Sequence, residues 1–206
     1  MAGCFITFEG TEGCGKSTHI KKLASRLKAE GRTVRTLREP GGTESGESIR
    51  HLLKHGPEEL TAEAELLLMN ASRAQLVREV IRPAIAAGEI VLCDRFYDST
   101  TVYQGTGRGL DAAQVQNVIE FAAGETRPDL TLLLQIPLKI SEERRARRAE
   151  TDRFEQADRA FFERIEAGYT ALAAAEPDRI RVIQADQPLD SVAATIWQVV
   201  SERLKM

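Results

Sequence analysis

The chain has 206 residues, of which 42% are hydrophobic and 29% are charged. This balance is typical of a globular domain and excludes collagen-like and disordered chains. Its 28 basic and 31 acidic residues leave a formal charge of −3, which argues against a dedicated nucleic-acid-binding domain because such domains are strongly basic. The three cysteines, Cys4, Cys14 and Cys93, form no Cys-x-x-Cys pair, so we expect reduced, buried thiols. The sequence shows no signal peptide and no apolar stretch of transmembrane length, and we therefore expect a cytoplasmic protein.

Short β-rich segments alternate with helical patterns along the chain. Strands are predicted at residues 4–9, 33–37, 89–93, 129–135 and 179–184. Helices are predicted after the first strand, at about 45–54, 61–87, 97–104 and 111–123, in an arginine-rich segment, from about residue 158, and at the C-terminus. Pro83 is expected to kink the long third helix and Gly88 to end it. The alternation predicts one α/β domain over residues 1–206, with three layers and a five-stranded parallel sheet flanked by helices.

A phosphate-binding loop is predicted at the end of the first strand. Residues 10–17 read GTEGCGKS, a full match to Gly-x-x-x-x-Gly-Lys-Ser/Thr in the strand-to-helix context that this motif requires. Its glycines let backbone N–H groups approach phosphate oxygens, and the helix N-terminus adds partial positive charge. We expect Lys16 to contact the β- and γ-phosphates. The residues expected to bind ATP are Gly10, Thr11, Glu12, Gly13, Cys14, Gly15, Lys16, Ser17 and Thr18.

A magnesium site is predicted beside this loop. Asp94 ends the apolar run IVLC, and a carboxylate at the end of the neighbouring strand is typical of proteins with this loop. Together with the Ser17 hydroxyl, it supplies the oxygen ligands that Mg²⁺ prefers. Arg95 follows directly, at the carboxyl end of the sheet, where ligands bind in open α/β folds.

The loop alone does not distinguish a switch GTPase, a motor and a kinase. The second half of the chain has no Asn-Lys-x-Asp segment for guanine recognition, and a motor usually needs a longer chain. Several separate arginines favour a small kinase that holds two phosphorylated substrates. The candidates are Arg38, Arg50, Arg73, Arg95, Arg144, Arg145, Arg147 and Arg148.

Eight segments together resemble the bacterial thymidylate kinases. They are FEGTEGCGKST (8–18), REPGGT (38–43), SIRHLL (48–53), SRAQL (72–76), DRF (94–96), STTVYQGTGRG (99–109), RPDLTLLL (127–134) and DRFEQ (152–156). The resemblance implies transfer of the γ-phosphoryl group of ATP to dTMP, giving dTDP and ADP, with Mg²⁺, in a homodimer. The apolar run at residues 66–69 is compatible with a dimer interface and equally with buried core.

The resemblance also implies roles for individual residues at the dTMP site. It implies that Arg50 and Arg95 hold the acceptor phosphate and that Arg73, Gln104 and Thr100 lie at the thymine edge. It also implies that the Tyr103 ring crowds the sugar 2′ position and that the Glu39 carboxylate lies near the sugar and the metal.

The catalytic arginine is expected in a lid at about residues 141–156. Glu12 stands where eukaryotic relatives carry an arginine, a feature of the bacterial subtype, so the lid has to supply the cation. The segment from Glu142 to Arg153 holds five arginines and four acids. Arg148 aligns best with the family's lid arginine, and Arg144 is the second choice. Besides Arg148, the resemblance gives Lys16, Arg95 and Glu12 catalytic roles.

One position departs from the family pattern. Four residues before Arg73 the family usually has a phenylalanine that stacks on the base, whereas this chain has Met69. A thioether on thymine contributes about 0.3–1.5 kcal/mol, and a helix-core methionine is the alternative. The departure affects the expected affinity for the base.

Other interpretations remain open at this point. The acceptor could be dUMP or a ribonucleotide, or the protein could use ATP as a regulatory switch. Nucleic-acid binding through RRARR (144–148) is weakened by the acids that flank it. His51 and His55 are spaced as a metal pair on a predicted helix, but no third ligand follows from the sequence.

Overall fold

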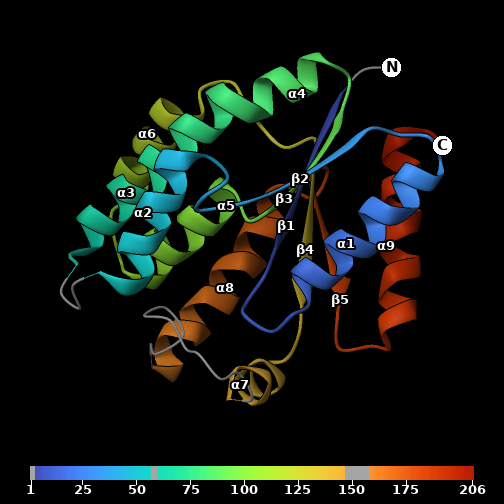
Figure 1. Cartoon of the computed structure of the whole chain (residues 1–206). Helices are drawn as coiled ribbons and strands as arrows, with labels where there is room; N and C mark the ends of the chain where they lie inside the picture. Colours follow the sequence, from blue (N-terminus) through green and yellow to red (C-terminus); the bar gives the residue numbers. More distant parts are fainter. Residues whose placement is uncertain (1–2, 57–59, 147–157) are drawn as a thin grey trace.

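The computed structural model describes residues 3–56, 60–146 and 158–206. Its strands form one parallel sheet in the order β2-β3-β1-β4-β5, seen nearly edge-on in Figure 1. The predicted α/β fold with a five-stranded parallel sheet is confirmed. The strands are β1 (Cys4–Glu9), β2 (Val34–Arg38), β3 (Ile90–Asp94), β4 (Leu130–Gln135) and β5 (Ile180–Gln184).

Helices cover both faces of this sheet (Figure 1). Helices α1 and α9 lie on one face, and α3 to α6 with α8 lie on the other. Two π-helical segments, η1 and η2, extend α3 and α5. The helices are α1 (Lys16–Ala29), α2 (Glu44–His55), α3 (Ala62–Leu76), η1 (Val77–Ile81), α4 (Arg82–Ala86), α5 (Tyr97–Thr100), η2 (Thr101–Gly107), α6 (Ala112–Ala123), α7 (Leu138–Ala146), α8 (Arg159–Ala175) and α9 (Leu189–Leu204).

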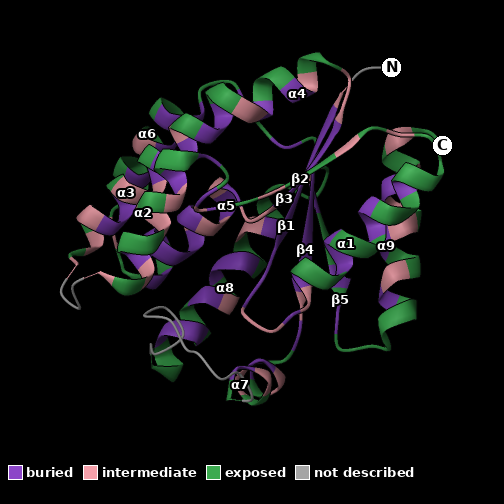
Figure 2. Ribbon diagram, in the orientation of Figure 1, coloured by how far each residue is buried: buried purple, intermediate pink, exposed green. Residues whose placement is uncertain are grey.

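The central strand β1 shows why the sheet needs cover on both sides. Every residue of β1 is buried, and successive side chains point to opposite faces. Ile6 and Phe8 pack in a core with residues of α1 and α9, whereas Phe5 packs against Leu76 and Val77 on the other side. Figure 2 shows β1, β3 and β4 almost wholly in the colour of buried residues, whereas the edge strands β2 and β5 contain exposed residues. A near-continuous apolar strand is what a parallel sheet between two helical layers requires.

The long helix predicted over residues 61–87 is three segments. Helix α3 continues into η1 and then α4, and Pro83 occupies the first turn of α4. Proline has no N–H to donate and its ring crowds the carbonyl four residues earlier, so the wider turn of η1 accommodates it where a regular α-helix does not. Gly88, with φ 80°, follows the end of α4, as predicted.

The helix predicted over residues 97–104 also changes its winding. It begins as α5 and becomes η2 from Thr101, so the segment that carries Tyr103 and Gln104 has π-helical geometry. The three cysteines are buried and free of disulfides, as expected. Within the described ranges, no helix combines the length and the apolarity needed to cross a membrane.

Candidate active site

The phosphate-binding loop joins β1 to α1 at the carboxyl end of the sheet. Gly10 has φ 129°, and a Cβ there would collide with the carbonyl oxygen of Leu134 in β4. Gly15 takes a left-handed conformation, with φ 97°, directly before the first residue of α1. These two positions explain the glycines of the motif: one allows close approach to the neighbouring strand and the other turns the chain into the helix.

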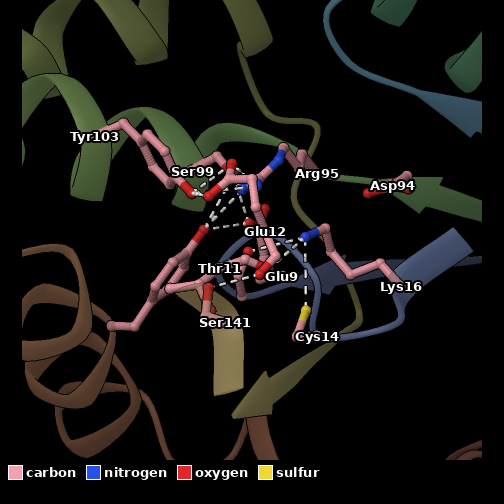
Figure 3. Close-up of polar contacts among 12 residues, drawn as sticks. Glu9, Thr11, Glu12, Cys14, Lys16, Asp94, Arg95, Ser99, Tyr103 and Ser141 are labelled. Carbon is pink, nitrogen blue, oxygen red and sulfur yellow. Dashed lines mark hydrogen bonds and ion pairs between the residues drawn. The ribbon is translucent and has the colours of Figure 1, made fainter. Parts of the chain in front are cut away.

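Lys16 is buried beneath this loop. Its Nζ donates to the carbonyl oxygens of Gly10 at 2.9 Å and Thr11 at 3.1 Å, and lies 3.6 Å from the sulfur of Cys14 (Figure 3). The Cys14 side chain is part of the hydrophobic core. Within the predicted ATP site, the Lys16 side chain therefore places a positive charge at the loop. Only the backbone of Cys14, and not its side chain, is available to contact a phosphate.

Ser17 and Asp94 form the predicted metal pair. The Ser17 hydroxyl donates to Oδ2 of Asp94 at 2.8 Å, and both residues line the cleft described below. An exposed hydroxyl and a half-buried carboxylate beside a phosphate loop fit Mg²⁺, which keeps several waters and binds through one or two carboxylates and substrate phosphates. In the part of the chain that the structure describes, no group of three or more His, Cys, Asp or Glu side chains is arranged to hold a metal ion.

Arg95 lies at the centre of the site in a strained backbone conformation. It is one of two non-glycine residues with positive φ, at 71°, among the described residues, and such strain is often found at functional positions. Its guanidinium contacts Glu12 at 2.7 Å, Ser99 at 2.9 Å and the hydroxyl of Tyr103 at 3.2 Å (Figure 3). Because these partners come from the phosphate loop, α5 and η2, Arg95 joins three elements.

Tyr103 donates to the carboxylate of Glu12, at 2.9 Å to each oxygen. Burial raises the pKa of Tyr103 well above its usual value, so the hydroxyl keeps the proton that it donates. The Tyr103 ring also lies beneath the Arg95 guanidinium, whose carbon is 4.9 Å from the ring centre. Glu12, Arg95 and Tyr103, predicted separately from the sequence, therefore form one polar unit.

A buried carboxylate that was not predicted from the sequence lies behind Arg95. Glu9, at the end of β1, accepts hydrogen bonds from the Phe96 N–H at 2.8 Å, Ser99 at 2.6 Å and Tyr169 at 2.8 Å. Burial raises the pKa of Glu9, and the nearby charge of Asp98 adds to this effect. The available signal was a charged residue that ends an otherwise apolar strand.

A second polar group surrounds Arg73 on α3. The guanidinium donates to Oε2 of Glu39 from Nε at 2.9 Å and from Nη2 at 2.7 Å. It also donates to Oδ1 of Asn70 at 2.8 Å and to Oγ1 of Thr100 at 3.0 Å. Arg73 and Glu39 are almost fully buried. Burial raises the pKa of Glu39 to about 7, although the charge of Arg73 opposes the shift.

Gln104 forms the third polar group. Its Nε2 donates to Oε1 of Glu65 at 2.7 Å, and Arg108 contacts the same carboxylate at 3.2 Å. Glu65, Met69 and Arg73 are spaced four residues apart and therefore share one face of α3. Met69 is half-buried and lines the cleft, so it is not an enclosed core residue.

A cleft of about 510 Å³ lies at this site; Arg73, Arg95, Tyr103 and Gln104 line it, whereas Glu9 and Glu65 lie behind its wall. Most of the predicted site residues lie on its wall, as do the candidate arginines Arg38 and Arg144, and Phe96 and Ser99 join them. Gly10, Thr11 and Cys14 do not line it. The predicted residues on the wall are Glu12, Gly13, Gly15, Lys16, Ser17, Thr18, Glu39, Arg50, Met69, Arg73, Asp94, Arg95, Thr100, Tyr103 and Gln104.

The described part of the predicted lid contacts the phosphate loop. On α7, the Ser141 hydroxyl donates to the carbonyl oxygen of Glu12 at 2.7 Å, and Arg144 donates to that of Gly13 at 2.8 Å. Arg148 and Arg153 lie outside the described residues. The rings of His51 and His55 lie with their centres 5.1 Å apart and their planes tilted by 45°, and neither belongs to a metal-binding cluster within the described ranges.

Known proteins resemble this chain over nearly its whole length. The family model for thymidylate kinase matches residues 8–196. The chain is 50% identical to a thymidylate kinase of Alcanivorax borkumensis over 203 residues, 98% of each chain. It is 47% identical to one of Deinococcus radiodurans over 201 residues, again 98% of each. A crystal structure of thymidylate kinase from Ehrlichia chaffeensis superposes with a TM-score of 0.80 at 30% identity, covering 97% of this chain and 99% of that one.

Proposed function

The chain belongs to the thymidylate kinase family, and we propose that the cleft between the phosphate loop, α3 and η2 is its active site. The enzyme transfers the γ-phosphoryl group of ATP to dTMP, giving dTDP and ADP on the route to dTTP. The observation that best supports the proposed site is the ion pair between Arg95 and Glu12, because it joins the phosphate loop to the elements that carry the predicted dTMP residues.

We propose that ATP enters at the phosphate loop. Backbone N–H groups of residues 10–18 surround its phosphates, and Lys16 turns its Nζ from the carbonyls of Gly10 and Thr11 toward the β- and γ-phosphates. Because the Lys16 ammonium group already lies at the loop, ATP binding would replace its contacts with carbonyl oxygens by contacts with phosphate oxygens. The Cys14 side chain stays in the core.

The acceptor dTMP would occupy the opposite part of the cleft. Arg50 and Arg95 hold its 5′-phosphate, as forked guanidiniums suit a phosphate. Arg73, Thr100 and Gln104 lie at the thymine edge and Met69 lies against the ring. Tyr103 crowds the sugar 2′ position, and Glu39 lies near the sugar.

Phosphoryl transfer requires that the acceptor oxygen and the γ-phosphorus be held in line and that the developing charge be neutralised. In this cleft, Lys16 and Arg95 supply positive charge from two sides, and Glu12 fixes the direction of Arg95. Ser17 and Asp94 would hold Mg²⁺, which would offset the negative charge of the ATP phosphates.

We propose that residues 141–156 form a lid that supplies the remaining cation. Arg148 keeps the catalytic role expected from the resemblance. Arg144 is the alternative, because it already lies on the cleft wall and donates to the loop. Closure of the lid would exclude water and so suppress ATP hydrolysis.

We further propose that residues 1–206 work as one kinase domain, in the cytoplasm, as a homodimer. The support for a dimer is apolar surface on two helices that pack together: Leu67 on α3 is 58% exposed and Phe121 on α6 is 86% exposed. If this surface is the interface, a Leu67→Glu, Phe121→Glu variant should have half the wild-type mass in light scattering. An unchanged mass would place the interface elsewhere or exclude the dimer.

The site is tested by ADP release with a panel of nucleoside monophosphates. We expect dTMP to give the fastest release, and Arg73→Ala and Gln104→Ala to raise KM for dTMP far more than KM for ATP. Preference for dUMP or a ribonucleotide would change the acceptor assignment. Slow ADP release that no acceptor stimulates would instead favour a nucleotide-dependent switch.

A further inference from the structure

The amide of Gln104 meets a carboxylate on the side of α3. Its Nε2 lies 2.7 Å from Oε1 of Glu65, and both side chains are about 1% exposed. A carboxylate only accepts hydrogen bonds, so it can meet an amide only through the NH₂ end. Rotating the Gln104 amide by 180° would place two oxygens against each other in a buried site, which carries the cost of an unpaired polar contact.

The carboxylate of Glu65 is itself held in place. Arg108 contacts it through Nε at 3.4 Å and through Nη2 at 3.2 Å. The Arg108 guanidinium also lies over the ring of Phe161, with its carbon 4.9 Å from the ring centre. Arg108 is 29% exposed, whereas Glu65 is 1% exposed. The Arg108 guanidinium thus contacts both oxygens of the carboxylate, and Oε1 also accepts the hydrogen bond from Gln104.

We propose that Glu65 is a specificity-determining residue that acts through Gln104. By holding the NH₂ group of that amide, it leaves the carbonyl oxygen as the atom that Gln104 offers to a base in the cleft. The inference rests on the proposed position of Gln104 at the thymine edge. Glu65 touches no substrate and is a positioning residue.

As a consequence, Gln104 selects pyrimidines that carry a hydrogen at N3. Thymine and uracil carry a donor at N3, which matches a carbonyl oxygen. Cytosine has an acceptor at N3. If dCMP were bound, the N3 lone pair would therefore face a lone pair of the Gln104 carbonyl oxygen. A site with a fixed acceptor rejects the wrong base because its buried polar group is then left unpaired. Glu65 therefore discriminates dTMP from dCMP, and it does not discriminate dTMP from dUMP.

The test is the Glu65→Gln variant, in which the partner of Gln104 is itself an amide. Such a partner can both donate and accept, so the Gln104 amide can pair with it in either of its two orientations. We expect the ratio of kcat/KM for dTMP to that for dCMP to fall by about tenfold, which lies within the cost of leaving one buried polar group unpaired. The ratio for dTMP against dUMP should stay unchanged. Glu63→Gln, on an exposed position of the same helix, is the matched control and should change neither ratio.

A double-mutant cycle separates positioning from packing. In a Gln104→Ala background, Glu65→Gln should leave the dTMP to dCMP ratio where Gln104→Ala alone puts it. Equal losses for all three acceptors, or the same effect in both backgrounds, would show that Glu65 only supports the fold and would overturn the inference.

Two further outcomes have distinct meanings. If Glu65→Gln does not fold, Glu65→Asp keeps the charge and withdraws the carboxylate by one methylene; its dTMP to dCMP ratio should also fall, and an unchanged ratio contradicts the inference. If the wild-type enzyme itself shows no preference for dTMP over dCMP, the proposed thymine edge is wrong, which is a failure of the site assignment and not of Glu65 alone.

Discussion

The Ser17 hydroxyl lies 2.8 Å from a carboxylate oxygen of Asp94, so the first turn of α1 and the end of β3 meet at one point. These residues are 77 positions apart in the chain, and the parallel pairing of β1 with β3 brings them together. The pair lies beside the phosphate loop, where we propose that Mg²⁺ binds together with ATP.

We expect Asp94→Asn to raise the Mg²⁺ concentration needed for half-maximal activity, because the amide keeps the shape of the side chain but removes its negative charge. Titration of activity with Mg²⁺ at saturating ATP and dTMP measures the effect, and chelation should abolish turnover of the wild type. Asp190→Asn, an exposed position on α9, is the control. A variant with the wild-type Mg²⁺ dependence would remove Asp94 from the metal site.

Lys16→Ala should abolish phosphoryl transfer and leave the fold intact. The Lys16 amino group contacts carbonyl oxygens of its own loop and contributes charge rather than packing. Circular dichroism checks the fold, and a coupled assay for ADP measures turnover. Lys22→Ala, on an exposed position of the same helix, should keep wild-type activity. Wild-type turnover by a folded Lys16→Ala enzyme would refute the assignment of the phosphate loop.

Met69→Phe should tighten dTMP binding. Met69 is half-buried on the cleft wall, and base stacking on an aromatic ring contributes about 1–3 kcal/mol, more than a thioether contact does. Isothermal titration with dTMP measures the change in Kd, and ATP binding serves as the internal control. Weaker dTMP binding would mean that Met69 packs between helices and that the base lies elsewhere.

Glu39 should give the reaction a pH dependence near neutrality. Burial raises its pKa from 4.5 to about 7, so the carboxyl group ionises as the pH rises through that value and then pairs fully with Arg73. We expect kcat/KM for dTMP to increase between about pH 6 and about pH 8. Glu39→Gln should lack this rise, and a variant that keeps it would assign the titration to another group.

The stability contribution of Glu39 has the opposite sign. Folding raises the pKa of this carboxyl group, so the folded state binds the proton more tightly than the unfolded chain does. The contribution is complete below pH 4.5 and is lost as the pH rises through about 7. Denaturant unfolding at several pH values should therefore show a smaller decline in stability over this interval for Glu39→Gln than for the wild type.

Arg148→Ala should lower kcat strongly with little change in KM for dTMP, because the interaction forms mainly in the transition state. Arginines that act in this way contribute about 10³–10⁵ in turnover in related phosphoryl transferases. Steady-state kinetics of single alanine variants at Arg144, Arg148 and Arg153 would identify the residue. A drop of less than about tenfold at Arg148 transfers the role to one of the other two, and equally small drops at all three exclude the lid.

The sequence by itself determined the sheet, the phosphate loop and most of the residues on the cleft wall. The reason is that these features have local signatures. A strand buried on both faces has to be apolar throughout, and a loop that surrounds phosphate needs glycines at fixed positions, as at Gly10 and Gly15. Resemblance to a known family then assigned roles to Arg73, Arg95 and Gln104, and the fold placed all three in one cleft.

Only the tertiary structure decided which polar groups pair with one another. Glu9 with Tyr169, Glu12 with Arg95, and Glu65 with Gln104 are 160, 83 and 39 residues apart, and no spacing rule in the chain links them. Their pairing depends on strand register and on the angle at which η2 passes α3. Both are set by the packing of the two helical layers, because a buried charge has to find its partner among the side chains that packing brings within reach.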